Sequence, residues 1–463
     1  MTHPAPGPSA TSTPPSPGFG ATVQRLLGLA WPVLVAQISS MLQMVSDTLL
    51  AGRYSTQDLA AVAVGNGVYI SVVMLMVGIL QSVSPTVAHH VGARRQAEIA
   101  PTLHQGLWLA LLLCVPTFAF MRHPGLLLDL AQVGPEIRPL TEAYLATIAW
   151  GLPGALLYRT FYAFSNALGH NKALMKISLS CTAVHIPLSW ALMNGHLGLP
   201  PLGAAGCAAS SACIGWLALG LGALHAWRAP VYRPYALFTH WQGPQRARLA
   251  ELVRLGLPMG FSSFVEVSAF TLISLLIARL GPDVVAGHRI TANISALIYM
   301  VPLALGVATL VLVGQALGAG NRRAARHKAF VGTVVAATAC TLLALGLWLG
   351  QGAVLGAYTR DAQVQGIAAS MLIYTCLYQF FDAIQTIAAH ALRGYKITFG
   401  PMLVHALCFW GIGLAGGYLL AFHGLGAWLA PQGVAGFWQA ADLSTLAAAL
   451  MFGTYLYRVA QQT

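Results

Sequence analysis

The sequence predicts an all-α membrane protein, and three observations point to this class: composition, segment length and an internal repeat. Apolar residues make up 57% of the 463-residue chain, whereas charged residues make up only 8%. A soluble globular protein carries about 25% charged residues. The apolar residues are gathered in stretches close to the roughly 20 residues that a helix needs to cross a bilayer. Helices are expected because a backbone in lipid must satisfy its own hydrogen bonds and barrel strands are far shorter.

The chain begins with a segment that is not expected to enter the membrane. Residues 1–20 are mostly Pro, Ser, Thr, Gly and Ala, without a regular apolar pattern. This composition predicts a disordered tail, which we assign to residues 1–23. The tail lacks the basic start and short apolar core of a signal peptide. The first apolar segment is therefore expected to stay in the protein.

Twelve apolar segments follow, and each is predicted to be a transmembrane helix. Several contain proline, such as Pro32, Pro187 and Pro302, which in membrane helices marks kinks or close packing rather than termination. The segments are approximately 26–51, 59–82, 103–121, 140–163, 173–194, 203–226, 252–279, 285–313, 328–350, 364–389, 399–421 and 434–457.

Basic residues predict the orientation of these helices. With an inside N-terminus and twelve spans, seventeen Lys and Arg residues fall on the inner side and six on the outer side. Because cytoplasmic loops collect basic residues, both termini are expected to be cytoplasmic. The same rule explains the net charge of +12, which in a soluble protein would suggest nucleic acid; no nucleic-acid partner is expected. We expect a multi-pass membrane protein.

The two halves of the chain resemble each other at a shift of 226 residues. This shift aligns Pro32 with Pro258, and it aligns Arg53 with Arg279. It also aligns the V-x-x-x-x-G-A pattern that starts at Val87 with the one that starts at Val313. An even number of spans per repeat predicts two six-helix lobes related by a pseudo-two-fold axis along the membrane normal, with a cavity between them. The predicted parts are the N-lobe, a cytoplasmic linker and the C-lobe, at 24–226, 227–251 and 252–463.

Three acidic residues lie inside apolar segments: Asp47, Glu266 and Asp382. A carboxylate at membrane depth costs roughly 2.5–3.5 kcal/mol on insertion scales. Buried membrane carboxylates usually mark a path for ions, protons or cationic substrates. The alternative for any one of them is a position near a helix end, from which the side chain reaches the interface.

Several kinds of site are not indicated. The seven cysteines lie in or at the ends of apolar segments without a C-x-x-C pair, which is typical of small packing residues. No His/Cys cluster has the spacing of a metal site, and no Walker A sequence is present. We therefore expect no cofactor and no direct use of ATP.

A set of short motifs resembles the multidrug and toxic compound extrusion (MATE) family, specifically its bacterial cation-coupled branch. The resemblance covers roughly residues 24–457, and the combination of motifs is specific although no single one is. The motifs are W-P-V-L at 31–34, V-S-D-T-L-L-A-G at 45–52, both V-x-x-x-x-G-A patterns, G-L-P at 256–258, F-x-E-V at 264–267, Y-Q-x-x-D-A-I-Q at 378–385 and A-L-R-G-Y-K at 391–396.

The resemblance implies a secondary antiporter that exports organic cations or zwitterions in exchange for Na⁺ or H⁺ by alternating access. It implies that Asp47 is the N-lobe carboxylate of the family, and that Glu266 and Asp382 are the C-lobe acidic pair. Tyr378 matches an aromatic residue beside that pair and shares a helix face with Asp382. Carboxylates suit Na⁺, so Glu266 and Asp382 could hold that ion, and a buried carboxylate can instead carry a proton.

The chain departs from the family pattern in two places. Where the fifth helix commonly carries N-x-P-x-N, this chain has His185 and Ser189 around Pro187. Where the eighth helix commonly begins A-A-H-Q, this chain has Arg289 in place of the amide. We expect His185 to link Asp47 to protons, and Arg289 to pair with Glu266 or Asp382, unless Arg289 lies at the outer helix end.

Two further residues are candidates for lining the substrate cavity. Gln385 follows Asp382 in the family motif, and Asp442 is an acidic residue of the last segment. For Asp442, an interfacial position is an equal alternative. The expected partners are small drugs or dyes, mostly cationic, and membrane lipids, with the protein acting as a monomer.

The main alternative function is a flippase for a lipid-linked precursor, which shares the wider superfamily architecture. Such proteins usually have a cavity rich in basic residues that meets lipid phosphates. Here only Arg159 and Arg289 are bases that could lie near a cavity, against at least three acids. A membrane enzyme or a channel is a third class, but the sequence shows neither a nucleophile–base pair nor a selectivity-filter pattern.

Overall fold

The computed structural model describes residues 18–462 except 131–132, 197, 199 and 425–429, and these residues form helices and no strand. The longer helices correspond to the predicted apolar segments. The α-helices are α1 (Phe19–Tyr54), α2 (Thr56–Leu80), α3 (Val83–Gly92), α4 (Ile99–Arg122), α5 (Gly125–Leu130), α6 (Arg138–Ile148), α7 (Leu152–Ala167), α8 (Asn171–Asn194), α9 (Ala204–Arg228), α10 (Arg246–Ile277), α11 (Pro282–Gly318), α12 (Arg322–Leu349), α13 (Gln351–Tyr358), α14 (Ala362–Gly394), α15 (Phe399–His405), α16 (Gly417–Phe422) and α17 (Val434–Gln462).

Short 3₁₀ and π segments connect or continue these helices. The four 3₁₀ segments are η1 (Gln96–Glu98), η2 (Ala149–Gly151), η3 (Pro230–Tyr235) and η4 (Ala278–Leu280). The segment η5 (Ala406–Gly416) is π-helical and joins α15 to α16 into one long helix. The fourth predicted span is built in the same way, because η2 joins α6 to α7.

Every predicted span is helical, and ten helical stretches of the described chain are long and apolar enough to cross a membrane. The fourth and fifth predicted spans are not among these ten. Both carry more polar residues, including Arg159 in α7 and Lys172 in α8. One boundary of the predicted tail is wrong, because α1 already begins at Phe19. The rest of the predicted tail, residues 1–17, lies outside the described residues.

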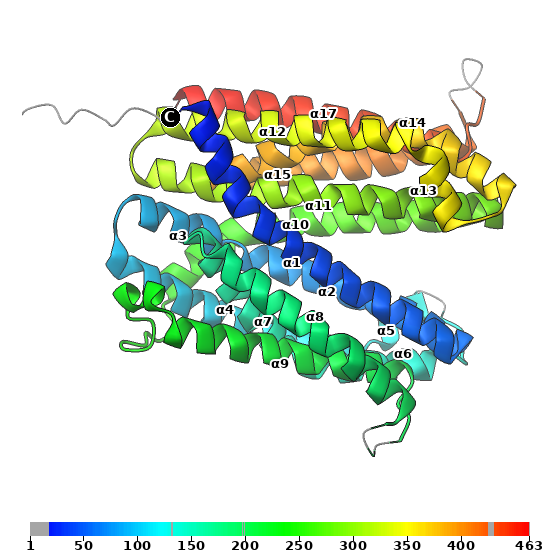
Figure 1. The fold of residues 1–463 in the computed structure, drawn as a ribbon, viewed down its shortest axis with the longest axis horizontal. Helices are drawn as coiled ribbons and strands as arrows, with labels where there is room; N and C mark the ends of the chain where they lie inside the picture. The colour runs from blue at the N-terminus through cyan, green and yellow to red at the C-terminus, as the bar shows by residue number, and fades with distance from the viewer. Residues whose placement is uncertain (1–17, 131–132, 197, 199, 425–429, 463) are drawn as a thin grey trace, which may run out of the picture.

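The helices form two bundles, seen one above the other in Figure 1. We name the bundle of α2 to α9 the first lobe and the bundle of α11 to α17 the second lobe. Helices α1 and α10 each contact both. The beginning of α1, at Leu26 and Ala30, belongs to the same buried core as Ala308 of α11, and α1 then packs against α8. Helix α10 likewise packs against α2 and then against η5.

Helices α1 and α10 begin the two halves of the sequence repeat, and each of them contacts both lobes. Equivalent residues of the two halves also make equivalent contacts between the lobes. A Cβ atom at Gly92 would collide with the backbone of Gln315, and one at Gly318 would collide with the backbone of His89. Gly92 and Gly318 are equivalent in the repeat, as are His89 and Gln315. The predicted pseudo-two-fold relation is therefore confirmed at these contacts. The exact domain boundaries proposed from the sequence stay a prediction.

The segment between α9 and α10, residues 229–245, packs closely on the first lobe. Tyr232 is buried, and its hydroxyl lies 2.6 Å from the Ser165 hydroxyl. His104 of α4 contacts the Leu237 carbonyl at 2.8 Å and packs against the Trp241 ring. This segment is shorter than the predicted linker because α10 begins at Arg246. We call the end of the molecule that carries it the linker end; the described chain begins and ends there too (Figure 1).

The lobe contacts at the linker end predict a specific sensitivity to side-chain size. Gly260 of α10 lies against the backbone of Leu75 and the side chain of Ile79, so a methyl group has no room there. We expect Gly260→Ala to lower the free energy of unfolding by about 1–3 kcal/mol through overpacking. The measurement is the thermal unfolding midpoint of the purified protein in detergent, at one heating rate.

Gly346→Ala is the matched control, because Gly346 also lies inside a long helix but has open space around it. That substitution should leave the midpoint unchanged or raise it slightly, since Ala favours helices over Gly. Equal midpoints for the two variants would contradict the close approach of α10 and α2.

Candidate functional site

The first lobe holds a buried cluster of polar side chains around Asp47. Asp47 lies on α1 and is 7% exposed, and His185 and Ser189 lie one turn apart on the facing helix α8. The Nε2 atom of His185 lies 2.9 Å from Asp47 Oδ1, and the Ser189 hydroxyl donates to the same oxygen at 2.8 Å. The structure thus brings together the predicted carboxylate and both residues that depart from the family pattern.

Ser210 of α9 completes this cluster on the other side of the imidazole ring. Its hydroxyl oxygen lies 3.0 Å from His185 Nδ1 and 3.2 Å from the His185 carbonyl oxygen. One hydroxyl hydrogen cannot serve both. If it points to Nδ1, that nitrogen accepts and the ring proton is on Nε2; if it points to the carbonyl, Nδ1 can carry a proton and donate to the hydroxyl oxygen. The cluster therefore has partners ready for both protonation states of His185.

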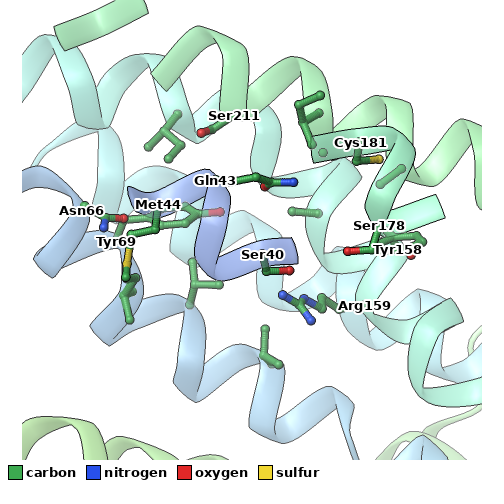
Figure 2. Close-up of a pocket in the computed structure, with 18 of the residues that line it drawn as sticks. Ser40, Gln43, Met44, Asn66, Tyr69, Tyr158, Arg159, Ser178, Cys181 and Ser211 are labelled. Carbon is green, nitrogen blue, oxygen red and sulfur yellow. The ribbon is translucent and has the colours of Figure 1, made fainter. Parts of the chain in front are cut away.

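A cavity of about 290 Å³ opens beside this cluster, between helices α1, α2, α7, α8 and α9. Its lining includes an acid and a base, Asp47 of α1 and Arg159 of α7. Figure 2 shows Arg159 directed into the cavity toward Ser40 of α1. The remaining lining is a mixture of apolar and aromatic side chains with a few amides and hydroxyls, which is the usual composition of a small-molecule site.

The second lobe holds a different buried network around Asp382. Asp382 of α14 is completely buried. Its Oδ1 accepts a hydrogen bond from Gln385 Nε2 at 2.8 Å, and Gln385 Oε1 lies 3.3 Å from His405 Nε2. The other carboxylate oxygen, Oδ2, has no hydrogen-bond partner among the described residues. No cationic side chain of the described chain forms an ion pair with Asp382.

Glu266 and Tyr378 lie in the neighbourhood of Asp382. Glu266 of α10 is half-buried and lies near enough to Asp382 of α14 and Tyr299 of α11 to interact with both electrostatically. Tyr378 is buried on α14 one turn before Asp382, with its ring edge-on to Phe270 and Trp438. The structure therefore brings the predicted acidic pair and its aromatic neighbour together.

The last two cavity candidates have different surroundings. Asp442 of α17 is half-buried, one turn after Trp438, and its Oδ1 is buried without a hydrogen-bond partner in the described residues. Arg289 is exposed, two turns from the start of α11, and forms no ion pair with either acidic residue of the second lobe. The expected pairing is thus absent, and the exposed Arg289 lies only seven residues from the start of α11. A role for Arg289 in substrate choice stays a prediction.

The acidic residues do not form a ready-made metal centre. The described part of the chain contains no group of three or more His, Cys, Asp or Glu residues that could hold a metal ion. The unpartnered Oδ2 of Asp382 and the carboxylate of Glu266 nevertheless offer oxygen atoms, which are the ligands that Na⁺ accepts. A proton on Asp382 would satisfy the same oxygen.

Three residues of these networks were not singled out from the sequence: Ser210, Tyr299 and His405. Gln379 stands in a family motif but was not predicted as a site residue; it is buried on α14 and donates to Ser295. Ser and Tyr are common in apolar segments, so neither Ser210 nor Tyr299 carries a distinguishing signal. His405 could have been found, because a histidine inside a predicted span is unusual.

Comparison with known proteins gives a consistent result. A family model described as MatE matches residues 32–191 and 258–419. The probable multidrug resistance protein NorM of Aromatoleum aromaticum is 55% identical over 435 residues, which are 94% of each chain. The multidrug resistance protein PmpM of Pseudomonas aeruginosa is 39% identical over 96% of this chain and 92% of its own. The chain therefore has close relatives along nearly its whole length.

The fold is also that of solved structures. An outward-facing multidrug resistance MATE family transporter of the MOP superfamily aligns with a TM-score of 0.85 at 17% identity, over 95% of this chain and 96% of that one. The eukaryotic MATE transporter AtDTX14 aligns with a TM-score of 0.83 at 19% identity, again over 95% and 96%. At such identities the likeness establishes the two-lobed fold alone.

The Asp47 cluster predicts a measurable coupling between two side chains. Ser189→Ala removes a hydrogen bond to a carboxylate, so we expect the free energy of unfolding to fall by about 1.5–3 kcal/mol. In an Asp47→Ala background the same substitution should cost much less, because its partner is gone. Thermal unfolding of the four proteins measures the interaction energy.

Ser211→Ala serves as the control, since Ser211 is the neighbour of Ser210 but forms no hydrogen bond in the structure. It should change stability little in either background. An unaltered effect of Ser189→Ala after removal of Asp47 would argue against the hydrogen bond.

Proposed function

Since the chain belongs to the MATE family of membrane transporters, we propose that it is a secondary active multidrug efflux antiporter. It is a multi-pass membrane transporter and not an enzyme. In this proposal it exports organic cations or zwitterions in exchange for Na⁺ or H⁺. The names of its relatives, which are multidrug resistance proteins, support drugs or dyes as substrates. The acid in the first-lobe cavity favours such substrates over the anionic lipid precursor of a flippase.

The observation that carries cation coupling is the buried, unneutralised carboxylate of Asp382. It accepts one hydrogen bond, leaves one oxygen without a partner and forms no ion pair with the described cationic side chains. An isolated buried charge is costly unless it is paired or protonated. A bound proton or cation removes this cost. We infer that Asp382, with Glu266 and Tyr378 beside it, binds the coupling ion.

Ion binding can drive transport only if it favours one arrangement of the lobes. In the structure the lobes touch at the linker end through glycine contacts, such as Gly92 with Gln315. Opening of that end and closure of the other would present the same cavities to the opposite side of the membrane. We propose that neutralisation of Asp47 and Asp382 shifts the balance between the two arrangements. A cationic drug and the coupling ion would then compete for the same charges.

The orientation inferred from basic residues completes the proposal. Seventeen of the Lys and Arg residues fall on the side that carries the linker and both termini. This asymmetry supports a cytoplasmic linker end and a cytoplasmic position of both termini. For a bacterial exporter, the inner membrane is the corresponding location, and the two lobes of one chain are sufficient for function as a monomer.

The first-lobe cluster suggests which ion acts there. His185 contacts Asp47 through a ring nitrogen, a type of atom that binds Na⁺ poorly but that can accept and donate a proton. Ser210 supplies a partner for the other ring nitrogen in both protonation states. We propose that Asp47 and His185 bind and release protons as a unit.

Loss of either second-lobe acid should abolish coupled export. Glu266→Gln and Asp382→Asn keep the size of each side chain but remove the charge that the coupling ion neutralises. We expect the driven export of a cationic dye to fall to the level of empty proteoliposomes, with insertion and abundance unchanged. The measurement is dye movement under an imposed Na⁺ or H⁺ gradient, one at a time.

Glu136→Gln is the matched control, because Glu136 is exposed and lies outside the helices. It should export like the unmodified protein. Full export by both Glu266→Gln and Asp382→Asn at equal abundance would refute the assignment.

Replacement of His185 should alter the dependence on the proton gradient. His185→Asn restores the amide common in relatives and removes the titrating ring beside Asp47. We expect export driven by a proton gradient to weaken and export driven by Na⁺ to appear or increase. If proton-driven export is unchanged and Na⁺ still adds nothing, His185 does not determine the ion used by the first lobe.

A further inference from the structure

We propose that Arg159 forms an anion-binding end of the first-lobe cavity, which takes the carboxylate of a zwitterionic substrate while Asp47 takes its amine. This inference rests on the proposed function and adds to it the charge pattern of the preferred substrate. It assigns two separate ends to a cavity of about 290 Å³. A ligand with charges of both signs would satisfy both ends at once.

The guanidinium of Arg159 is available for a ligand. It is half-buried within a transmembrane lobe, and it forms neither an ion pair nor a hydrogen bond with the described residues. The guanidinium lies over the ring of Tyr162, at 5.9 Å from Cζ to the ring centre. An arginine keeps its proton in proteins, so a permanent positive charge lies at this wall of the cavity. A membrane-embedded charge without a partner indicates a functional site.

Among the described residues, no carboxylate pairs with Arg159 to neutralise its charge. Tyr158 also lines the cavity, and its hydroxyl is buried without a hydrogen-bond partner in the described part of the chain. The hydroxyls of Ser40 and Ser178 lie on the same lining and donate their hydrogens to the Ala36 carbonyl. The guanidinium and the Tyr158 hydroxyl thus offer donors without an anionic partner. A carboxylate group of a ligand can supply the missing anionic acceptor, because it can accept two parallel hydrogen bonds from one guanidinium.

The acidic end of the cavity lies farther along α1. Figure 2 shows the Arg159 side chain pointing toward Ser40, and Asp47 follows Ser40 by two helical turns. Two turns correspond to about 10 Å along the helix axis. A rigid ligand with its carboxylate and its basic amine about this far apart could reach both ends. Tyr69 and Tyr162 also line the cavity and supply aromatic surface for the body of such a ligand.

The arrangement also discriminates against other ligands. A ligand with a positive charge alone gains the contact with Asp47 but meets the charge of Arg159 without compensation. A ligand with a negative charge alone gains the contact with Arg159 but is repelled by the carboxylate of Asp47. Zwitterions are therefore preferred over cations of the same size and shape. This preference is distinct from ion coupling, because it depends on Arg159, which lies in neither carboxylate network.

The test compares two ligands that differ only at the carboxyl group: a fluoroquinolone with a free carboxylate and a basic ring amine, and its methyl ester. Binding to the purified full-length protein is measured by ligand fluorescence, for the unmodified protein, Arg159→Gln, Arg159→Lys and Arg122→Gln. Arg122 is the control, because it is exposed at the end of α4 and does not line the cavity.

The unmodified protein should bind the acid about ten-fold more tightly than the ester, as expected for a charge-assisted hydrogen-bonded pair. Arg159→Gln should remove this difference by weakening the acid while leaving the ester equal or tighter. Arg159→Lys should retain part of it, and Arg122→Gln all of it. Proteoliposome export of the same two compounds should follow the same order.

Two results would overturn the proposal. One is equal binding of acid and ester by the unmodified protein, which requires no variant and so does not depend on the folding of Arg159→Gln. The other is an equal weakening of both ligands in Arg159→Gln, which would indicate a structural role. Failure of the proposed function would look different, since neither compound would then be exported under any ion gradient although both still bind.

Discussion

The cost of a buried charge without a partner is the constraint on which the rest of this structure depends. Asp382 is fully buried, and one of its oxygens has no partner among the described residues, a cost that the bound proton or cation of our proposal would remove. Asp47 meets the same constraint in another way, because His185 and Ser189 share its charge. The two lobes have the same helical plan but different chemistry at their carboxylates. This difference suits a cycle in which the lobes respond to different ligands.

Transport requires the lobes to separate at one end, and the glycine contacts at the linker end allow this. Gly92, Gly318 and Gly260 let the backbones come into direct contact. His89 and Gln315 add hydrogen bonds between the lobes, to the carbonyls of Gly394 and Ala167, so separation at this end must break a small number of polar contacts as well. The repeat places such contacts on both sides of the pseudo-two-fold axis.

The fold class, the repeat and the three membrane carboxylates could be predicted from the sequence alone, because each is visible as a local sequence pattern. A run of apolar residues, an aligned Pro32 and Pro258, or a lone Asp47 in an apolar segment can be read without knowing any contact. The networks could not be read in this way. Ser210 and His405 reach their partners only through helix packing, and the direction of the Arg289 side chain depends on which face of α11 is covered. Helix ends were also missed, since α1 begins at Phe19 and α10 at Arg246.

The packing of residues 229–245 has a mechanical consequence. Residues 229–245 are held on the first lobe by three contacts, from Tyr232 to Ser165 and from the segment to His104 and Gln105 of α4. The segment therefore cannot act as a flexible linker. Even Gln245 is fixed through its backbone N–H, which donates to Gln105 Oε1, so α10 starts directly from an anchored residue. Residues 229–245 therefore cannot extend when the lobes move relative to each other. The segment is therefore part of the first lobe, and so are the first turns of α10, since Arg248 pairs with Glu98 and Leu252 belongs to the core of that lobe.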